Sequence, residues 1–379
     1  MGSWKLSHQD NPLGGDDLVK SLGTSSRTMS DLPVIAITMG DPAGVGPEVI
    51  LKALARPEPW EVCNPLVVGD PLTLQRVSSL LGIRIPIKVV DVFPQGSTSP
   101  VVSVIKATQE DLAHIQWGKV DPRCGRAQVD FLQKALNMAL AGEVQAMVTA
   151  PIHKVGLKLA GVAFPGHTEM LAQWTNTRKF AMMLAGKFLR VVLVTIHCSL
   201  KEALERLSME GIKEVALLAH RALRDWFGIK KPRLAISGLN PHAGDQGLFG
   251  DEEERIITPA VRILKHEGLH VTGPVSPDAV FCMAADGVFD VVVAMYHDQG
   301  LIPLKLLERH GAVNLTLGLP IIRTSVDHGT AYDIAGTGKA SEQSLLEALM
   351  LAARLACHAG LNKSENASQT DSGKGSLPA

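Results

Sequence analysis

The sequence lacks the features that mark several large classes of protein. Its formal net charge is only −1, so it gives no reason to expect a nucleic acid or an anionic membrane as partner. No apolar run reaches the roughly 18 residues of a membrane-spanning helix. The five cysteines are scattered without a C-x-x-C pair, which argues against a disulfide framework and against a thiolate zinc site. This usage fits a reducing compartment, and we expect a cytoplasmic protein.

The composition is that of a soluble globular chain. Apolar residues make up 46 % and charged residues 20 % of 379 positions, enough for two ordinary domains. The first thirty residues are polar and rich in glycine and serine, without the basic and apolar regions of a signal peptide. We predict that residues 1–30 are a disordered extension and residues 363–379 a disordered tail.

Short apolar runs alternate with longer segments of helical spacing. The runs are VIAITM (34–39), PLVVG (65–69), QAMVTA (145–150), RVVLVTI (190–196), RLAISGL (233–239) and DVVVAMY (290–296). The helical segments are 125–142, 201–227, 252–268 and 341–359. This alternation predicts an α/β fold with a largely parallel sheet that is buried on both faces.

Polar or glycine-rich motifs follow five of these predicted strands. They are GDPAGVGPE, PIHK, His197, NPHAGD and HDQG. Ligands of open α/β sheets bind outside the carboxyl ends of the strands, so five such motifs indicate one shared site. Each motif taken alone is equally compatible with an ordinary loop.

Three histidines stand within a few residues of a predicted strand end: His197, His242 and His297. If their strands are neighbours, the three imidazoles can converge on a catalytic metal with open coordination positions. Nitrogen ligands suit zinc first, with cobalt and nickel as alternatives. From position alone, each histidine also fits a role in capping its loop. Asp298 is a candidate metal ligand, orienting residue or general base.

Two glycine-rich segments invite a comparison with phosphate-binding loops. GDPAGVGPE fails the G-x-G-x-x-G test at Val49 and lacks the end of a P-loop, but Pro47 and Glu48 make a good helix start. Asp41 is placed to face a site there. The second segment, residues 314–340, contains Arg323, and Lys305 precedes it. Both cations are candidates to bind an anionic group, although a single basic residue is more often a solvated surface charge.

Together these motifs resemble the 4-hydroxythreonine-4-phosphate dehydrogenase family of pyridoxal phosphate synthesis. GDPAGVGPE, TAPIHK, FPGHTE, GLNPHAG, MYHDQGLIPLK and VNLTLGLPIIRTSVDHGTAYDIAGTGKA occur in the family's order over about residues 33–357. The resemblance implies an isocitrate/isopropylmalate-dehydrogenase-like fold with two α/β domains flanking a cleft. We assign residues 31–135 plus 315–362 to the first domain, on the NAD side, and 136–314 to the second, with the metal ligands and dimer contacts. It also implies NAD, a divalent metal (zinc first, then cobalt or magnesium) and a homodimer with its site at the subunit interface.

The resemblance carries roles onto individual residues. The metal ligands fall on His197, His242 and His297. The substrate contacts fall on His167, Thr168, Lys305, Asn314 and Arg323. The loop DHGTAYDIAG is similar to the adenosine-binding loop of the decarboxylating dehydrogenases, which assigns Asp327, His328, Gly329, Thr330, Ala331 and Asp333 to NAD. Candidates for the general base are Asp298, Lys154 and, less favoured, Asp278.

The implied reaction is the NAD-dependent oxidation of 4-phosphohydroxy-L-threonine at C3, with decarboxylation to 3-amino-2-oxopropyl phosphate. Relatives with the same motifs act on 4-phospho-D-threonate, on 4-phospho-D-erythronate or on a dihydroxylated cyclohexadiene dicarboxylate. The chain departs from the family at Ala279, where threonine is expected. A metal-dependent hydrolase is a less favoured alternative, since three histidines and a bound water also serve hydrolysis. A binding protein that has lost its chemistry is a third.

Overall fold

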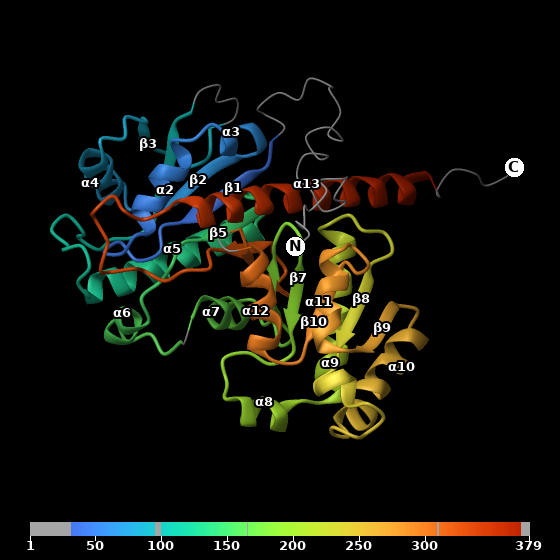
Figure 1. The fold of residues 1–379 in the computed structure, drawn as a ribbon. Coiled ribbons are helices and arrows are strands. Elements are labelled where there is room, and N and C mark those ends of the chain that lie inside the picture. The colour runs from blue at the N-terminus through green and yellow to red at the C-terminus, as the bar shows by residue number, and fades with distance from the viewer. Residues whose placement is uncertain (1–31, 95–99, 165, 309–310, 373–379) are drawn as a thin grey trace, which may run out of the picture. The chain divides into compact units, whose positions relative to one another are not determined.

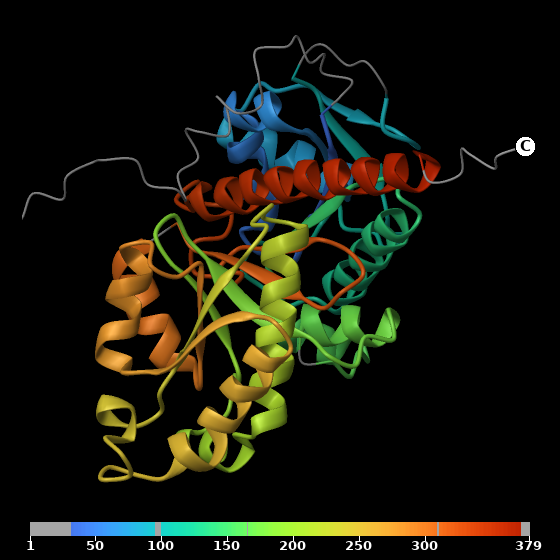
Figure 2. The same cartoon turned by 90° about the vertical axis from the view of Figure 1, so that its right-hand side faces the viewer.

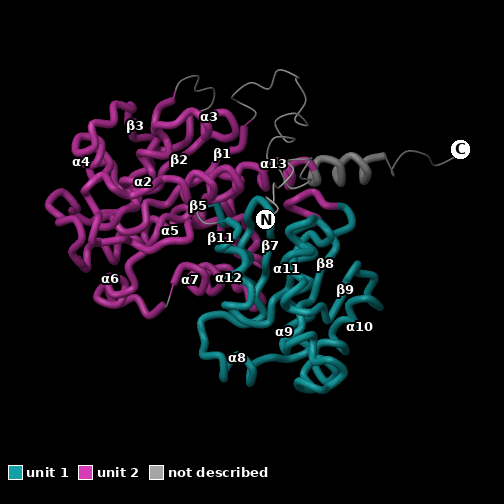
Figure 3. The backbone as a smooth tube through the Cα atoms, in the orientation of Figure 1, with its two compact units in different colours: residues 1–26, 181–223, 230–312 teal, residues 27–180, 224–229, 313–379 magenta. Residues whose placement is uncertain are grey.

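The computed structural model describes residues 32–94, 100–164, 166–308 and 311–372, and the extension predicted at residues 1–30 lies outside this part. The chain divides into two compact units (Figure 3). Within the described residues, unit 1 contains Ala181–Leu223 and Lys230–Ala312. Unit 2 contains the chain up to Phe180, the short segment Arg224–Ile229 and the chain from Val313 onward.

Unit 2 is built on a mostly parallel sheet in the order β3-β4-β2-β1-β5-β12-β11. Figure 1 labels four of these strands, β1, β2, β3 and β5. Only β11 and β12 pair antiparallel. The strands are β1 (Val34–Thr38), β2 (Asn64–Gly69), β3 (Ile87–Val89), β4 (Val102–Lys106), β5 (Ala146–Thr149), β11 (Val313–Leu317) and β12 (Arg323–Ser325). The helices are α2 (Gly46–Leu54), α3 (Glu58–Val62), α4 (Pro71–Leu81), α5 (Pro122–Leu140), α6 (Lys154–Leu159), α7 (His167–Trp174) and α13 (Gln343–Ser372).

Local signals explain where the unit 2 helices begin and end. The Asp70 carboxylate accepts a hydrogen bond from the Thr73 amide and so caps α4, which ends at Gly82 in the left-handed region at φ 66°. Asp121 caps α5 in the same way. The central strands β1, β2 and β5 are almost wholly buried, which explains their continuous apolar sequences.

Helix α13 contains the stretch Gln343–Leu361, which is long and apolar enough to cross a membrane by length and composition alone, with a mean hydropathy of 1.3. The sequence has no continuous apolar run of that length. Half of the apolar window is buried in the structure. Leu345, Ala348, Leu349 and Ala352 are fully buried at helical spacing, and α13 packs on β5, β11 and β12. This is the pattern of a core helix. The helix runs to Ser372, into the segment predicted as a disordered tail.

Unit 1 has a five-strand sheet in the order β6-β7-β10-β8-β9, in which only β6 and β7 pair antiparallel. Its strands are β6 (Ala181–Ala185), β7 (Arg190–Leu193), β8 (Arg233–Ser237), β9 (His270–Val275) and β10 (Val291–Ala294). Its helices are α8 (Leu200–Arg206), α9 (Met209–Asp225), the 3-10 turn η2 (Pro241–Gly244), the π-helical turn η3 (Glu253–Ile257), α10 (Thr258–His266), α11 (Pro277–Ala285) and α12 (His297–Glu308).

Helices cover both faces of this sheet. Figure 2 shows α11 and α12, in orange, on one side of the strands and α9 on the other. The α11–α12 face holds a buried cluster to which Val191, Val292, Phe281 and Leu304 belong. The prediction of an α/β fold with a largely parallel, doubly covered sheet is therefore confirmed.

The units divide the chain at Phe180/Ala181 and Ala312/Val313, whereas the sequence suggested boundaries after residues 135 and 314. The difference has a structural reason. Strand β5 pairs in parallel with both β1 and β12, so the chain remains in unit 2 beyond α5. Helices α6 and α7 then follow in the same unit before β6 begins unit 1.

Candidate functional site

The three predicted metal-binding histidines follow three neighbouring strands of unit 1. Strand β10 lies between β7 and β8 and pairs in parallel with both. His197 follows β7, His297 follows β10 and His242 follows β8. Carboxyl ends of parallel strands share one edge of a sheet, and neighbouring strands lie only about 5 Å apart. The condition on which the metal hypothesis depends, that these strands be neighbours, is met.

His197 and His297 face each other at this edge. Their ring centroids are 5.8 Å apart with the planes tilted by 43°. Zinc binds imidazole nitrogen at about 2.0–2.1 Å, so two rings at this separation suit one shared ion. His297 opens α12, and its Nδ1 lies 2.7 Å from Asp298 Oδ1, which leaves Nε2 for a ligand.

His242 is not brought into the same cluster within one chain. Its ring lies 6.3 Å from the ring of Phe249. Among the described residues, no group of three or more His, Cys, Asp or Glu side chains is arranged to hold a metal ion. His197 and His242 nevertheless share an unusual backbone, with φ of 41° and 53°. Such left-handed conformations are costly for residues other than glycine and concentrate at functional sites.

The other candidates in unit 1 are exposed. Asp278 lies in the first turn of α11, and a hydrogen bond from the Ser276 hydroxyl holds the pKa of its carboxyl below the usual value. The charge of His242 acts in the same direction. Lys305 lies on α12 with its side chain exposed.

In unit 2 the most telling candidate is Arg323, on β12. It is 3 % exposed. Its Nε and Nη2 donate to Thr149 Oγ1 at 3.1 and 2.7 Å, and Nη1 donates to Thr316 Oγ1 at 2.9 Å. No carboxylate forms an ion pair with it in the part of the chain that the structure describes. Burial lowers the pKa of the guanidinium to about 10, against the opposing charge of Glu169.

His167, Thr168 and Asn314 are the other substrate-binding candidates in unit 2. His167 and Thr168 open α7 directly after its N-cap, Gly166. Burial, assisted by the positive charge of Arg323, holds the pKa of His167 well below its usual value, so its imidazole is neutral. Asn314 Oδ1, on β11, is buried and has no hydrogen-bond partner among the described residues. A buried acceptor without a partner is costly, and a ligand that donates to it would remove the cost.

The predicted NAD loop follows β12. Asp327, His328, Gly329 and Asp333 are exposed, and Ala331 has φ of 42°. The Thr330 carbonyl accepts a hydrogen bond from the Val45 amide at 3.0 Å. A Cβ built on Gly329 would meet no atom within 4 Å, so neither packing nor a positive φ explains this glycine.

Asp41 supports this loop. The sequence placed it near a site but did not predict its hydrogen-bond partners. Asp41 is buried rather than open, with its carboxylate bound by the Tyr332 hydroxyl and the Ala43 amide. Burial raises the pKa of Asp41, and these two hydrogen bonds oppose the rise. The Tyr332 ring stacks on His153 with centroids 4.3 Å apart. Tyr332 belongs to a motif that the sequence singles out, but its partner is 291 positions away.

The glycine-rich segment before α2 has a structural explanation. A Cβ on Gly46 would lie 2.2 Å from the Met39 carbonyl oxygen, and Gly40 has φ of 69°. Glu48 accepts a hydrogen bond from Lys52 in the next turn of the helix. Lys154, the remaining candidate for the base, is exposed at the first position of α6, after its cap His153.

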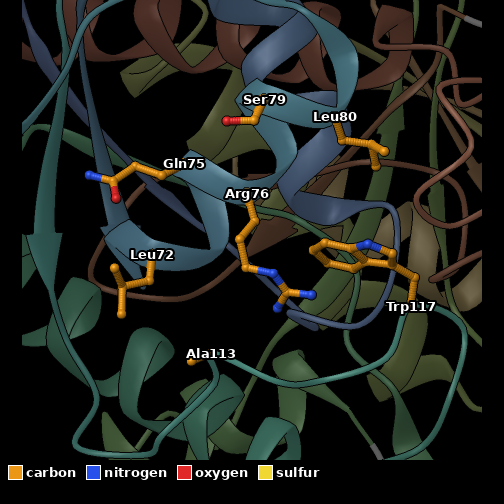
Figure 4. A pocket seen from close by; sticks show the side chains of 7 residues that line it. All are labelled: Leu72, Gln75, Arg76, Ser79, Leu80, Ala113 and Trp117. Carbon is orange, nitrogen blue, oxygen red and sulfur yellow. The ribbon is translucent and has the colours of Figure 1, made fainter.

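A surface cavity of about 700 Å³ in unit 2 contains none of the predicted site residues (Figure 4). Its lining is Leu72, Gln75, Arg76, Ser79, Leu80, Ala113 and Trp117. The Arg76 guanidinium already has partners within the protein. Its Cζ lies 4.7 Å from the centroid of the Trp117 ring, and its nitrogens donate to the carbonyls of Leu112 and Ile115. The buried and strained residues described above are better evidence for the site than this open hollow.

Comparisons with known proteins show the family to which the chain is related. Residues 61–352 match the family model described as "Pyridoxal phosphate biosynthetic protein PdxA". A 4-hydroxythreonine-4-phosphate dehydrogenase of Desulfosudis oleivorans is 51 % identical over 325 residues, covering 86 % of this chain and 96 % of that protein. A D-threonate 4-phosphate dehydrogenase of Pectobacterium atrosepticum is 44 % identical, with 85 % and 99 % covered. The crystal structure of a 4-hydroxythreonine-4-phosphate dehydrogenase from Klebsiella pneumoniae is 46 % identical and superposes with a TM-score of 0.81, covering 86 % and 99 % of the two chains.

Proposed function

The chain belongs to the PdxA family of pyridoxal phosphate biosynthetic proteins, and we propose that it oxidises 4-phosphohydroxy-L-threonine at C3 with NAD. Loss of carbon dioxide from the resulting 3-keto acid then gives 3-amino-2-oxopropyl phosphate. The predictions of the family and of a dehydrogenase are confirmed by relatives of 44–51 % identity that carry dehydrogenase names. The substrate, cofactor and site residues are the proposal.

The buried guanidinium of Arg323 is the observation that carries the substrate class. Among the described residues, the Arg323 guanidinium is hydrogen-bonded only to threonine hydroxyls. A buried cation with such partners keeps an uncompensated charge, and an anionic substrate group would compensate it. We assign the phosphate to His167 and Thr168, with Arg323 and Lys305 as candidate basic partners. Neutral His167 and the first turn of α7 supply hydrogen-bond donors to such an anion. Asn314 accepts a hydrogen bond from a donor group of the substrate.

The facing pair His197 and His297 fits a divalent metal, with zinc as first choice and cobalt or magnesium as alternatives. A metal held there would lower the pKa of the substrate's C3 hydroxyl and would stabilise the negative charge that develops on decarboxylation. Asp298 orients His297 through the bond to Nδ1. Lys154 and Asp278 then remain as candidates to accept the hydroxyl proton.

A homodimer with a shared site accounts for the position of His242. One chain brings only two of the three histidines together, so we propose that two subunits each contribute ligands to one site. Helix α12 supports this proposal, because Ile302 and Leu306, one turn apart, are 65 % and 74 % exposed. Apolar side chains that stand out in this way on one helix face suit contact with another subunit. The metal assignment is tested by His242→Ala, which should reduce both metal content and turnover; a variant that keeps both would refute it.

The exposed loop from Asp327 to Asp333 is proposed to bind the adenosine part of NAD. The open space beside Gly329 supports this assignment, because a glycine that packing does not require allows a ligand to approach the backbone closely. His328, Thr330 and Ala331 belong to the same loop. Asp41 and Tyr332 hold the loop against the segment before α2.

A second candidate function is the same chemistry on 4-phospho-D-threonate or 4-phospho-D-erythronate. The Pectobacterium relative, named a D-threonate 4-phosphate dehydrogenase, is 44 % identical, close to the 51 % of the Desulfosudis protein. The deciding experiment is NADH formation with zinc, cobalt or magnesium on each of the three substrates, with and without chelator. Chelator-sensitive turnover of 4-phosphohydroxy-L-threonine alone is the expected result. Preference for either sugar acid would refute 4-phosphohydroxy-L-threonine as the substrate. The absence of NADH formation on all three substrates would refute the proposed function.

A further inference from the structure

We infer that Gln299 is a positioning residue that ties the His297 and His242 segments together, and that Thr195 and Glu253 extend this network to all three metal-ligand candidates. The inference rests on the metal site of the proposed function. It starts from the strained backbone of His197 and His242, because such conformations persist only where surrounding interactions hold them.

The first connection joins the His197 and His297 segments. The Thr195 hydroxyl donates to the Met295 carbonyl at 2.8 Å, and the Thr195 amide donates to the same oxygen at 3.2 Å. Both residues lie past the last paired residues of β7 and β10. The side chain of Thr195 therefore prolongs the contact between the two strands up to two residues before each histidine.

The second connection is made by the side-chain amide of Gln299. Its Oε1 accepts from the Met295 amide at 2.7 Å, and its Nε2 donates to the Gly238 carbonyl at 2.7 Å. Gln299 is 8 % exposed. Only a side chain that offers both an acceptor and a donor can make this bridge between the ends of β10 and β8. This explains why a buried glutamine directly follows His297 and Asp298.

The third connection holds the segment that leads to His242. The Glu253 carboxylate is 3 % exposed and accepts from the amides of Leu239 and Asn240, both at 2.7 Å. It also accepts from Asn240 Nδ2 at 2.9 Å. A Cβ on Gly244 would lie 2.8 Å from Glu253 Oε2, so the loop folds closely over this carboxylate.

The network runs through consecutive backbone groups. The Met295 carbonyl accepts from Thr195, and the Met295 amide donates to Gln299. Gln299 in turn donates to the Gly238 carbonyl. The next two amides, of Leu239 and Asn240, donate to Glu253. None of the three side chains needs to touch metal or substrate to act. Their role is to keep each histidine segment in register with the others, as outer hydrogen bonds do at many metal sites.

The test compares Gln299→Met, which keeps the length but removes both hydrogen bonds, with Gln299→Glu, which keeps the acceptor but places an oxygen against the Gly238 carbonyl. Glu253→Gln and Thr195→Val test the two ends of the hydrogen-bond network. Matched controls are Gln109→Met and Glu254→Gln at exposed positions. Zinc affinity is measured on the full-length protein by chelator competition, beside thermal unfolding of the metal-free form and the kcat and KM for NAD and substrate.

We expect zinc affinity to fall about ten- to hundredfold in both Gln299 variants, and less in Thr195→Val. Hydrogen exchange should become faster over residues 238–246. The fold-decrease in kcat should be larger than the fold-change in the KM for NAD. A lower melting temperature with unchanged zinc affinity would overturn the inference, because it would show a purely structural role. If Gln299→Met does not fold, unchanged zinc affinity in Thr195→Val and Glu253→Gln would overturn it equally. A wild-type protein that binds no zinc would refute the metal site itself, and the inference with it.

Discussion

Replacing Arg323 by Met tests whether its buried charge serves substrate binding or the stability of the fold. A guanidinium pKa that falls from its usual 12.5 to about 10 on folding corresponds to roughly 3 kcal/mol against the charged form. The arginine is charged at neutral pH in both the folded and the unfolded chain. Folding therefore bears this cost, and the substitution removes it.

Lost hydrogen bonds oppose this gain. Thr149 and Thr316 each lose a charged donor, which costs about 1.5–3 kcal/mol per partner. The free energy of unfolding of Arg323→Met should therefore stay the same or fall by up to about 3 kcal/mol. Substrate binding should weaken, because a charge-assisted hydrogen bond contributes about 1.5–3 kcal/mol, equivalent to a rise in KM of roughly 10- to 150-fold.

The assay is NADH formation over a range of substrate concentrations, together with urea unfolding of the same preparation. Arg126→Met is the matched control, since Arg126 is exposed, pairs with Glu110 and should change neither KM nor stability by much. A large loss of stability in Arg323→Met with an unchanged KM would refute the reasoning. It would mean that the buried charge serves the fold and not an anionic ligand.

Three further predictions concern single residues. The pKa of His167 is lower in the folded than in the unfolded chain, so its contribution to stability is present above about pH 6.5 and is lost as pH falls. In urea unfolding, His167→Asn should therefore lose less stability than the wild type between pH 7.5 and pH 5. An equal loss of stability in both proteins would contradict the lowered pKa. Tyr332→Phe removes one hydrogen-bond donor from the Asp41 carboxylate. It should lower the free energy of unfolding by about 1–3 kcal/mol and raise the KM for NAD. Unchanged values would show that this hydrogen bond contributes neither to stability nor to NAD binding. Gly329→Ala should leave the melting temperature unchanged and raise the KM for NAD, whereas Gly336→Ala, at φ 75°, should lower the melting temperature; a normal KM in Gly329→Ala would place NAD elsewhere.

Local sequence pattern was sufficient for the fold class and for the positions of the central strands. All six apolar runs correspond to strands, β1, β2, β5, β7, β8 and β10, because each is buried on both faces and so needs an unbroken apolar sequence. Two of the unpredicted strands lack that signal. Strand β3 is a short, largely exposed edge, and β12 has the polar sequence RTS. The segment 201–227, predicted as one helix, is divided into α8 and α9 without a glycine or proline to mark the break.

For the candidate site, too, the sequence determined some features and the tertiary structure others. The sequence by itself determined which residues stand at strand ends, because the change from an apolar run to His197, His242 or His297 is local. Only the tertiary structure decided that β10 lies between β7 and β8, that Gln299 reaches Gly238 across 61 positions and that Asp41 binds Tyr332 across 291. Periodicity records whether a side chain is buried, but not which distant group it meets. Strand order and long-range hydrogen bonds result from the packing of the whole chain, so Glu253 and Gln299 acquired their inferred roles only in the folded protein.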